Sequence, residues 1–223
     1  MSKNILIVGA SGLVGGEILK NLKTTNNDLI LLSRKKLLCE NSINQIVIDF
    51  ENIDSLDASL KVDEIYIAIG QKLSLSELVY ITKNNRKSFV NVDYNYIKKV
   101  AEFAKNCGAS SIGLISAIGA NTKSLNTYLK VKGNVEQEIK LVGYKKIIIA
   151  HPSHLLGKRA GEDIPMTVKV FEQITNLFGL LMIGPLQKFR NVEAKKVAKA
   201  IISKMDSVEE GIHYIDYKYF KNF

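Results

Sequence analysis

The sequence has no tryptophan and only two cysteines, three prolines and three histidines in 223 residues. Cys39 and Cys107 stand far apart, outside any C-x-x-C spacing or Cys/His cluster, so neither a disulfide framework nor a metal site is indicated. No stretch approaches the roughly 18 apolar residues of a membrane span, and the N-terminus lacks a basic-then-apolar leader. We therefore expect a cytoplasmic protein without membrane contact.

Acidic residues are outnumbered by basic ones. The chain has 22 Asp and Glu and 31 Lys and Arg, which gives a net charge of +9. The basic residues form only short clusters, as at 34–36, 195–196 and 218–221, and none reaches a block of five like charges. No recognition helix or RNA-binding aromatic motif accompanies them. We expect solvated helix faces rather than a nucleic-acid partner, which is the third interpretation of the net charge.

The N-terminal residues carry the most informative pattern. A run of four aliphatic residues, 5–8, is followed by Gly9, Gly12 and Gly15, and then by apolar residues at helical spacing. This pattern predicts a strand, a glycine turn and a helix. Gly9 permits a sharp turn, Gly12 lets the backbone approach a pyrophosphate, and Gly15 lets the helix pack on the strand. A dinucleotide diphosphate is expected at the positive end of this helix.

Strands and helices alternate along the rest of the chain. Apolar runs predict strands over 28–34, 45–50, 64–70, 111–116, 146–151 and 211–217. Helical spacing predicts helices over 92–107, 125–142, 166–178 and 192–205. Because the strands are apolar on both faces, the fold class predicted is α/β: a doubly wound parallel sheet covered by helices on each side. We expect one domain over 1–223, with 152–190 as a small substrate-side lid region within it.

The end of the second strand bears on the choice of cofactor. An acidic residue there accepts hydrogen bonds from the adenine ribose and selects NAD, but this chain has Ser33 and Arg34. A guanidinium suits a 2′-phosphate, so NADP (NADPH) is preferred, with NAD as the alternative. A plain solvated arginine is the other interpretation of Arg34.

Tyr128 and Lys132 are four residues apart on the helix over 125–142 and therefore emerge from one face. A nearby ammonium lowers the pKa of a phenol toward working pH, so Tyr128 is the candidate acid or base. Ser116, at the end of the fifth strand, is expected to hydrogen-bond the same substrate oxygen. Taken alone, the Y-x-x-x-K spacing is also that of any lysine-rich helix.

In this order the motifs resemble those of the atypical short-chain dehydrogenase/reductases, which have a Rossmann fold. The segments 92–94, 114–120 and 128–136 are similar to those of Tat-interacting-protein-like oxidoreductases, which bind NADPH, and the resemblance covers most of 3–157. It implies cofactor contacts at Gly9, Ser11, Gly12, Leu13, Val14, Ser33, Arg34, Asp49, Phe50, Ile69 and Gly70. Family members commonly carry Arg-Pro-Gly at the positions of residues 151–153, where this chain has His-Pro-Ser. The resemblance therefore implies that His151 lies near the cofactor, either as a contact or as a structural imidazole.

The function expected is an NADP(H)-dependent oxidoreductase that acts on a small carbonyl or hydroxyl substrate through Ser116, Tyr128 and Lys132. The alternative is an NADPH-binding regulator that acts through a protein partner with little or no turnover. The apolar run over 177–183 is either a pocket wall or a homodimer contact. The substrate is not specified by these residues.

Overall fold

Seven strands form the central sheet of the computed structural model, which describes residues 2–38, 43–157, 184–207 and 209–223. The strand order is β3-β2-β1-β4-β5-β6-β9, and all neighbours are parallel. The strands are β1 (Asn4–Val8), β2 (Asp28–Ser33), β3 (Asn44–Val47), β4 (Glu64–Ile67), β5 (Ser111–Ile115), β6 (Lys146–Ala150) and β9 (Gly211–Ile215). The order reverses between β1 and β4, which is where such sheets bind ligands. The predicted doubly wound sheet is confirmed.

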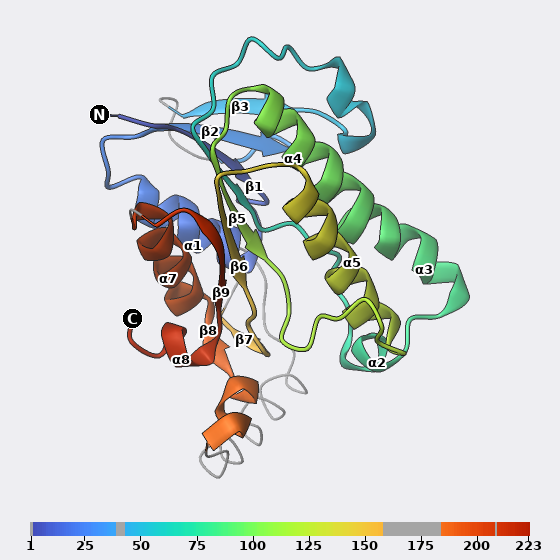
Figure 1. The fold of residues 1–223 in the computed structure, drawn as a ribbon. Coiled ribbons are helices and arrows are strands. Elements are labelled where there is room, and N and C mark those ends of the chain that lie inside the picture. Colours follow the sequence, from blue (N-terminus) through green and yellow to red (C-terminus); the bar gives the residue numbers. More distant parts are fainter. Residues whose placement is uncertain (1, 39–42, 158–183, 208) are drawn as a thin grey trace.

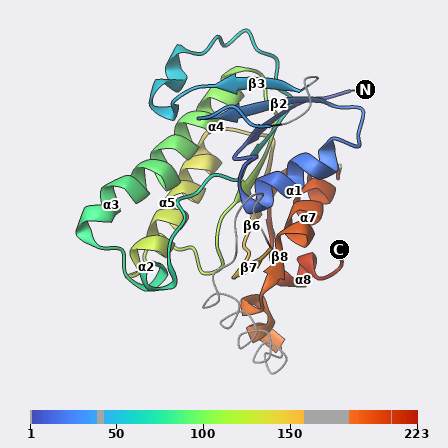
Figure 2. The same ribbon diagram turned by 180° about the vertical axis from the view of Figure 1, so that it is seen from behind.

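Helices cover both faces of the sheet (Figures 1 and 2). One layer consists of α1 (Leu13–Leu22), α7 (Ala194–Asp206) and the short α8 (Tyr217–Phe220), and the other of α4 (Ile97–Asn106) and α5 (Thr127–Leu141). Side chains of β1 alternate between the two layers, so that Ile5 and Ile7 pack toward α1 and α7 while Leu6 and Val8 pack toward α4 and α5. Burial on both faces explains why residues 5–8 of β1 are all apolar.

A continuous helical segment precedes β5. It consists of α3 (Lys83–Val90), a π-helical turn η2 (Asn91–Tyr96) and α4. The helix predicted over 92–107 therefore begins earlier, at Lys83. Its first part escaped detection because 83–88 are all polar and show no apolar spacing.

Local capping moves other predicted boundaries. The strand predicted over 45–50 ends at Val47, because Asp49 accepts a hydrogen bond from the Glu51 N–H and starts the 3₁₀ helix η1 (Phe50–Ser55). A Ser74–Glu77 capping box starts the unpredicted α2 (Leu75–Val79). The predicted helix over 192–205 starts two residues later, because β8 (Val192–Glu193) pairs with β7 (Leu155–Leu156).

The segment predicted as a lid, 152–190, lies partly outside the described residues. The helix predicted over 166–178 and the apolar run over 177–183 both fall there, so their proposed roles stay predictions. The described flanks are β7 and the 3₁₀ helix η3 (Gly184–Phe189).

Candidate active site

A cleft of about 530 Å³ opens beyond the carboxyl ends of β1, β2, β4 and β5. The predicted site residues that line it are Gly9, Ser11, Gly12, Leu13, Val14, Ser33, Arg34, Phe50, Ile69, Gly70, Ser116, Tyr128 and Lys132. Three predicted site residues, Gly15, Asp49 and His151, are not part of its lining. The chain thus brings most of the predicted residues to one end of the sheet.

The glycine turn between β1 and α1 is packed too tightly for side chains. Gly9 has a φ of 94°, and a Cβ there would lie 2.7 Å from the carbonyl carbon and oxygen of Ala68. A Cβ on Gly15 would lie 2.1 Å from the Gly9 oxygen, so Gly15 packs against the turn and does not face the cleft. Gly12 forms the N-cap of α1 without any side-chain cap, which leaves the positive helix end directed at the cleft.

Two predicted residues at the end of β2 line the cleft. Arg34 is exposed there, and the Ser33 hydroxyl donates to the Lys35 carbonyl at 2.7 Å, so its contact with a cofactor stays a prediction. Asp49 serves as the cap of η1. Phe50 lines the cleft and meets the Tyr96 ring edge-on, with 5.6 Å between ring centroids.

Lys132 and Asp93 form an ion pair at the inner end of the cleft. Lys132 Nζ lies 2.8 Å from Asp93 Oδ1, and the two side chains are 6% and 2% exposed. The other Asp93 oxygen accepts the Gln71 N–H at 2.7 Å. Burial is the largest single influence on the pKa of Lys132 and lowers it. The charges of Asp93 and then Tyr128 raise this pKa by more in total, so its net value is raised and the amine stays charged.

The Tyr128 phenol has a raised pKa. Burial is the largest cause, Lys132 lowers the pKa, and Asp93 raises it again. The expectation that Lys132 brings this pKa down toward neutral is therefore wrong for the free protein, because burial and the Asp93 charge outweigh it. Tyr128 is accordingly a protonated phenol at neutral pH.

Ser116 is hydrogen-bonded to a buried acid. Its hydroxyl donates to Oε1 of Glu136, and His151 Nε2 lies 2.8 Å from the same oxygen. His151 also packs on the Tyr214 ring, with 5.3 Å between centroids. His151 and the cleft residue Ser116 thus share one oxygen of Glu136, and the cofactor contact expected of His151 stays a prediction.

Several cleft residues were missed from the sequence. They are Leu32, Ala68, Gln71, Lys72, Ser88, Val92, Asp93, Tyr96, Ile115 and Leu155. A signal existed for Asp93, because it shares the helical spacing of the buried Tyr96, Ile97 and Val100. An acid on the apolar stripe of a helix indicates a buried partner. The others carry no sequence signal that separates them from ordinary strand, loop and helix residues.

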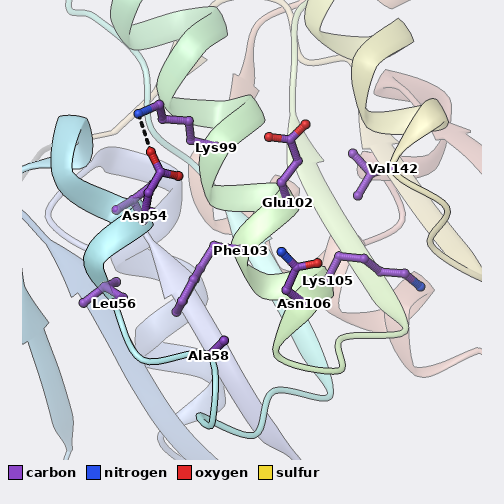
Figure 3. A pocket seen from close by; sticks show the side chains of 10 residues that line it. Asp54, Leu56, Ala58, Lys99, Glu102, Phe103, Lys105, Asn106 and Val142 are labelled. Carbon is purple, nitrogen blue, oxygen red and sulfur yellow. Dashed lines mark hydrogen bonds and ion pairs between the residues drawn. The ribbon is translucent and has the colours of Figure 1, made fainter.

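A second hollow, of about 490 Å³, lies between η1 and the C-terminal half of α4 (Figure 3). Phe103 lies within it, and a 2.8 Å ion pair between Lys99 and Asp54 stands at one side. Lys105 has its ammonium over the Tyr144 ring. This hollow contains none of the predicted site residues.

Comparison with characterised sequences identifies relatives. The chain is 32% identical over 165 residues to protein HTATIP2 of Rattus norvegicus, covering 71% of this chain and 65% of that protein. It is also 32% identical over 176 residues to protein FMP52, mitochondrial, of Lodderomyces elongisporus, covering 71% of this chain and 69% of the relative. The match thus spans slightly less than two thirds of the rat protein.

The expectation of a cytoplasmic location is contradicted by these relatives. The matching FMP52 proteins of several yeasts, including Candida albicans, are mitochondrial by name. The composition and the N-terminal pattern on which that expectation rested carry no signal for this location. Within the described ranges, no helix has both the length and the apolar character needed to cross a bilayer.

Solved structures share the fold. The structure titled "MoeE5 in complex with UDP-glucose and NAD" superposes with a TM-score of 0.69 at 11% identity, over 97% of this chain and 79% of that one. No family model matches the sequence. The 32% identity to FMP52, with 69% of that relative covered, shows that the chain belongs to the HTATIP2 and FMP52 family of atypical short-chain dehydrogenase/reductases, and the solved structure shows the shared fold.

Proposed function

We propose that this protein is an NADP(H)-dependent oxidoreductase that transfers hydride to or from a small carbonyl or hydroxyl substrate. The observation that supports it most is the convergence on one cleft of the Gly12 helix end, Arg34, and the trio of Ser116, Tyr128 and Lys132. Each group alone is common in proteins. Their arrangement along one cleft matches what a dinucleotide and a substrate need.

The cleft fits an anionic dinucleotide. Among the described residues, the charged side chains in its lining are Arg34, Lys72, Lys132 and Asp93, and the carboxylate of Asp93 is already paired with Lys132. A Cβ on Gly12 would lie 3.1 Å from the Gly9 oxygen, so the turn presents bare backbone where a diphosphate would approach. When bound, the nicotinamide supplies or accepts the hydride.

The chain supplies the proton chemistry. Tyr128 holds a proton on its phenol oxygen and can donate it to a substrate oxygen, since burial keeps the pKa of this phenol high. Ser116 directs its own hydrogen to Glu136 and so offers a lone pair, which suits the hydroxyl form of the substrate. Lys132 is placed to bind a ribose hydroxyl of the cofactor and to keep positive charge beside Tyr128.

The test is a steady-state assay of NADPH oxidation with a panel of aldehydes, ketones and quinones. Turnover with at least one carbonyl compound supports the proposal. Absence of NADPH binding, measured by calorimetry, would contradict it directly.

A regulator that binds NADPH without turnover is the second candidate. One observation favours it: Ser116 and Lys132 each already have an internal partner, Glu136 and Asp93. Tight NADPH binding with no turnover on any member of the panel would select this function.

Arg34→Asp is expected to weaken NADPH binding by about tenfold or more while changing NADH binding by much less, because a charge-assisted contact with the 2′-phosphate is lost. Calorimetric titration with both cofactors measures the two losses. Lys36→Asp makes the same charge change two residues away, at an exposed position outside the cleft lining, and is the matched control. Equal losses for NADPH and NADH in Arg34→Asp would remove Arg34 from the 2′-phosphate site.

A further inference from the structure

The hydrogen of the Ser116 hydroxyl points away from the cleft. Ser116 directly follows β5, its backbone N–H donates to the Ala150 carbonyl at 2.9 Å, and the residue is 5% exposed. Its hydroxyl donates to Oε1 of Glu136, a residue of α5 that stands outside the cleft lining. A hydroxyl carries one hydrogen and two acceptor lone pairs. With its hydrogen on Glu136, Ser116 presents a lone pair to the cleft.

Glu136 is held in this position by a second donor. His151 Nε2 lies 2.8 Å from the same Oε1 atom. The imidazole is fixed in turn, because the His151 backbone N–H donates to the Ile215 carbonyl at 2.8 Å and the ring packs on Tyr214. The Glu136 side chain is 6% exposed. Two donors that converge on one buried oxygen keep the glutamate from turning away, and so keep the Ser116 hydrogen out of the cleft.

Tyr128, which lines the same cleft, has the opposite polarity. Its phenol is protonated at neutral pH, because burial raises its pKa, and it can donate a hydrogen bond. A ligand oxygen that contacts both groups must therefore accept from Tyr128 and donate to Ser116. A hydroxyl oxygen does both. A carbonyl oxygen only accepts, so it meets the Ser116 lone pair unless the Ser116 hydrogen leaves Glu136, at the cost of that hydrogen bond.

We propose that Glu136, held by His151, is a positioning residue that fixes Ser116 as a hydrogen-bond acceptor, so that the site selects the hydroxyl form of its substrate over the carbonyl form. This inference rests on the proposed function and names an alcohol as the form of the substrate that the site binds. Glu136 acts through Ser116. Donation from Ser116 to a carbonyl oxygen would need the hydrogen that Glu136 holds.

Binding of two probes of similar shape, cyclohexanol and cyclohexanone, tests the inference. Cyclohexanol is titrated into the full chain with excess NADPH, and cyclohexanone into the full chain with excess NADP⁺, so that neither mixture can exchange hydride. Chemical-shift changes in the NMR spectrum give each affinity, and each probe is compared between wild type and variants. Wild-type protein that binds neither probe would overturn the inference.

Ser116→Ala distinguishes an acceptor from a donor at position 116. The affinity for cyclohexanol should fall by about fivefold, which corresponds to one ordinary hydrogen bond. The affinity for cyclohexanone should fall by less than about twofold, because Ser116 directs its hydrogen to Glu136 and not to the ligand. A larger loss for cyclohexanone than for cyclohexanol would show that Ser116 is a donor, and would overturn the inference.

Glu136→Met and Glu136→Gln are a matched pair that isolates the role of Glu136. Both remove the same negative charge and leave Lys132 paired with Asp93, but glutamine keeps an oxygen that can accept from Ser116 and His151. In Glu136→Met the Ser116 hydrogen is released to the cleft, so cyclohexanone should bind about fivefold more tightly than in wild type. In Glu136→Gln its affinity should stay within about twofold of wild type.

An affinity for cyclohexanone that is unchanged in Glu136→Met, or raised equally in both variants, would overturn the role of Glu136. If circular dichroism shows that Glu136→Met is unfolded, Ser116→Ala decides, because it leaves the contact between Glu136 and His151 in place.

These titrations measure binding and need no turnover. A protein that shows the expected affinities but oxidises NADPH with no carbonyl compound would refute the oxidoreductase function and leave the role of Glu136 intact. A protein that turns over, but whose Glu136→Met variant binds cyclohexanone as wild type does, would refute the role of Glu136 alone.

Discussion

Tyr128→Phe is expected to lower kcat for carbonyl reduction by at least about 100-fold, which is the lower end of what a positioned acid or base contributes. The substitution removes one oxygen and retains the ring that packs against Phe89. Folding and NADPH affinity should therefore stay close to wild type. Steady-state NADPH oxidation gives kcat, and calorimetric titration gives the cofactor affinity.

Tyr96→Phe is the matched control for this prediction. Tyr96 also lines the cleft, but its hydroxyl lies 3.1 Å from Glu51 Oε1 and 3.0 Å from the Asn91 side-chain nitrogen, so it is engaged away from Tyr128. Its kcat should change by less than about twofold, because no reacting proton is removed. If Tyr128→Phe and Tyr96→Phe lost activity equally, Tyr128 would not be the proton donor.

The sheet could be predicted from the sequence because burial dictates its pattern. Strands such as β1 and β6 lie between two helical layers, so every side chain after the first residue of each strand is apolar, and a short apolar run has few alternatives. The glycine turn was equally predictable, since Gly9 and Gly15 leave no space for a Cβ. These are local constraints, and each is recorded in a few consecutive residues.

The polar pairs could not be predicted in the same way. Asp93 meets Lys132, and Ser116 and His151 both meet Glu136, across gaps in sequence that the fold alone closes. The consequence for chemistry is large, because Y-x-x-x-K spacing by itself predicts a lowered phenol pKa, whereas burial, with a smaller contribution from Asp93, raises it. Spacing identifies which residues meet on a face but not which of them are already neutralised.

The polar helix α3 shows the other limit. Residues 83–88 form helix without an apolar stripe, and the buried side chain of α3 is Phe89, near its end. This segment is helical as the N-terminal part of the same continuous run as η2 and α4, so its structure comes from its neighbours. Periodicity detects helices that bury one face and misses those that extend another helix.

Gly15 and Gly16 are adjacent residues of α1 with different surroundings. A Cβ on Gly15 would lie 2.1 Å from the Gly9 oxygen and 2.7 Å from the Gly9 carbonyl carbon, both backbone atoms of the turn. A Cβ on Gly16 would meet the Ala10 oxygen at 3.3 Å. Substitution by alanine improves helix propensity by about 1 kcal/mol at both positions. Any difference in stability between the two variants therefore measures how tightly each position packs against the turn.

Gly15→Ala is therefore expected to lower the free energy of unfolding by about 3 kcal/mol, since the turn or the helix must shift to admit the methyl group. Because Gly9 and Gly12 lie in that turn, NADPH affinity should fall by about tenfold or more as well. Gly16→Ala should stay within about 1 kcal/mol of wild type and keep its cofactor affinity. Urea unfolding with and without NADPH measures both quantities. A stable Gly15→Ala protein that binds NADPH normally would mean that the turn yields easily, and that the packing between β1 and α1 does not shape the cofactor site.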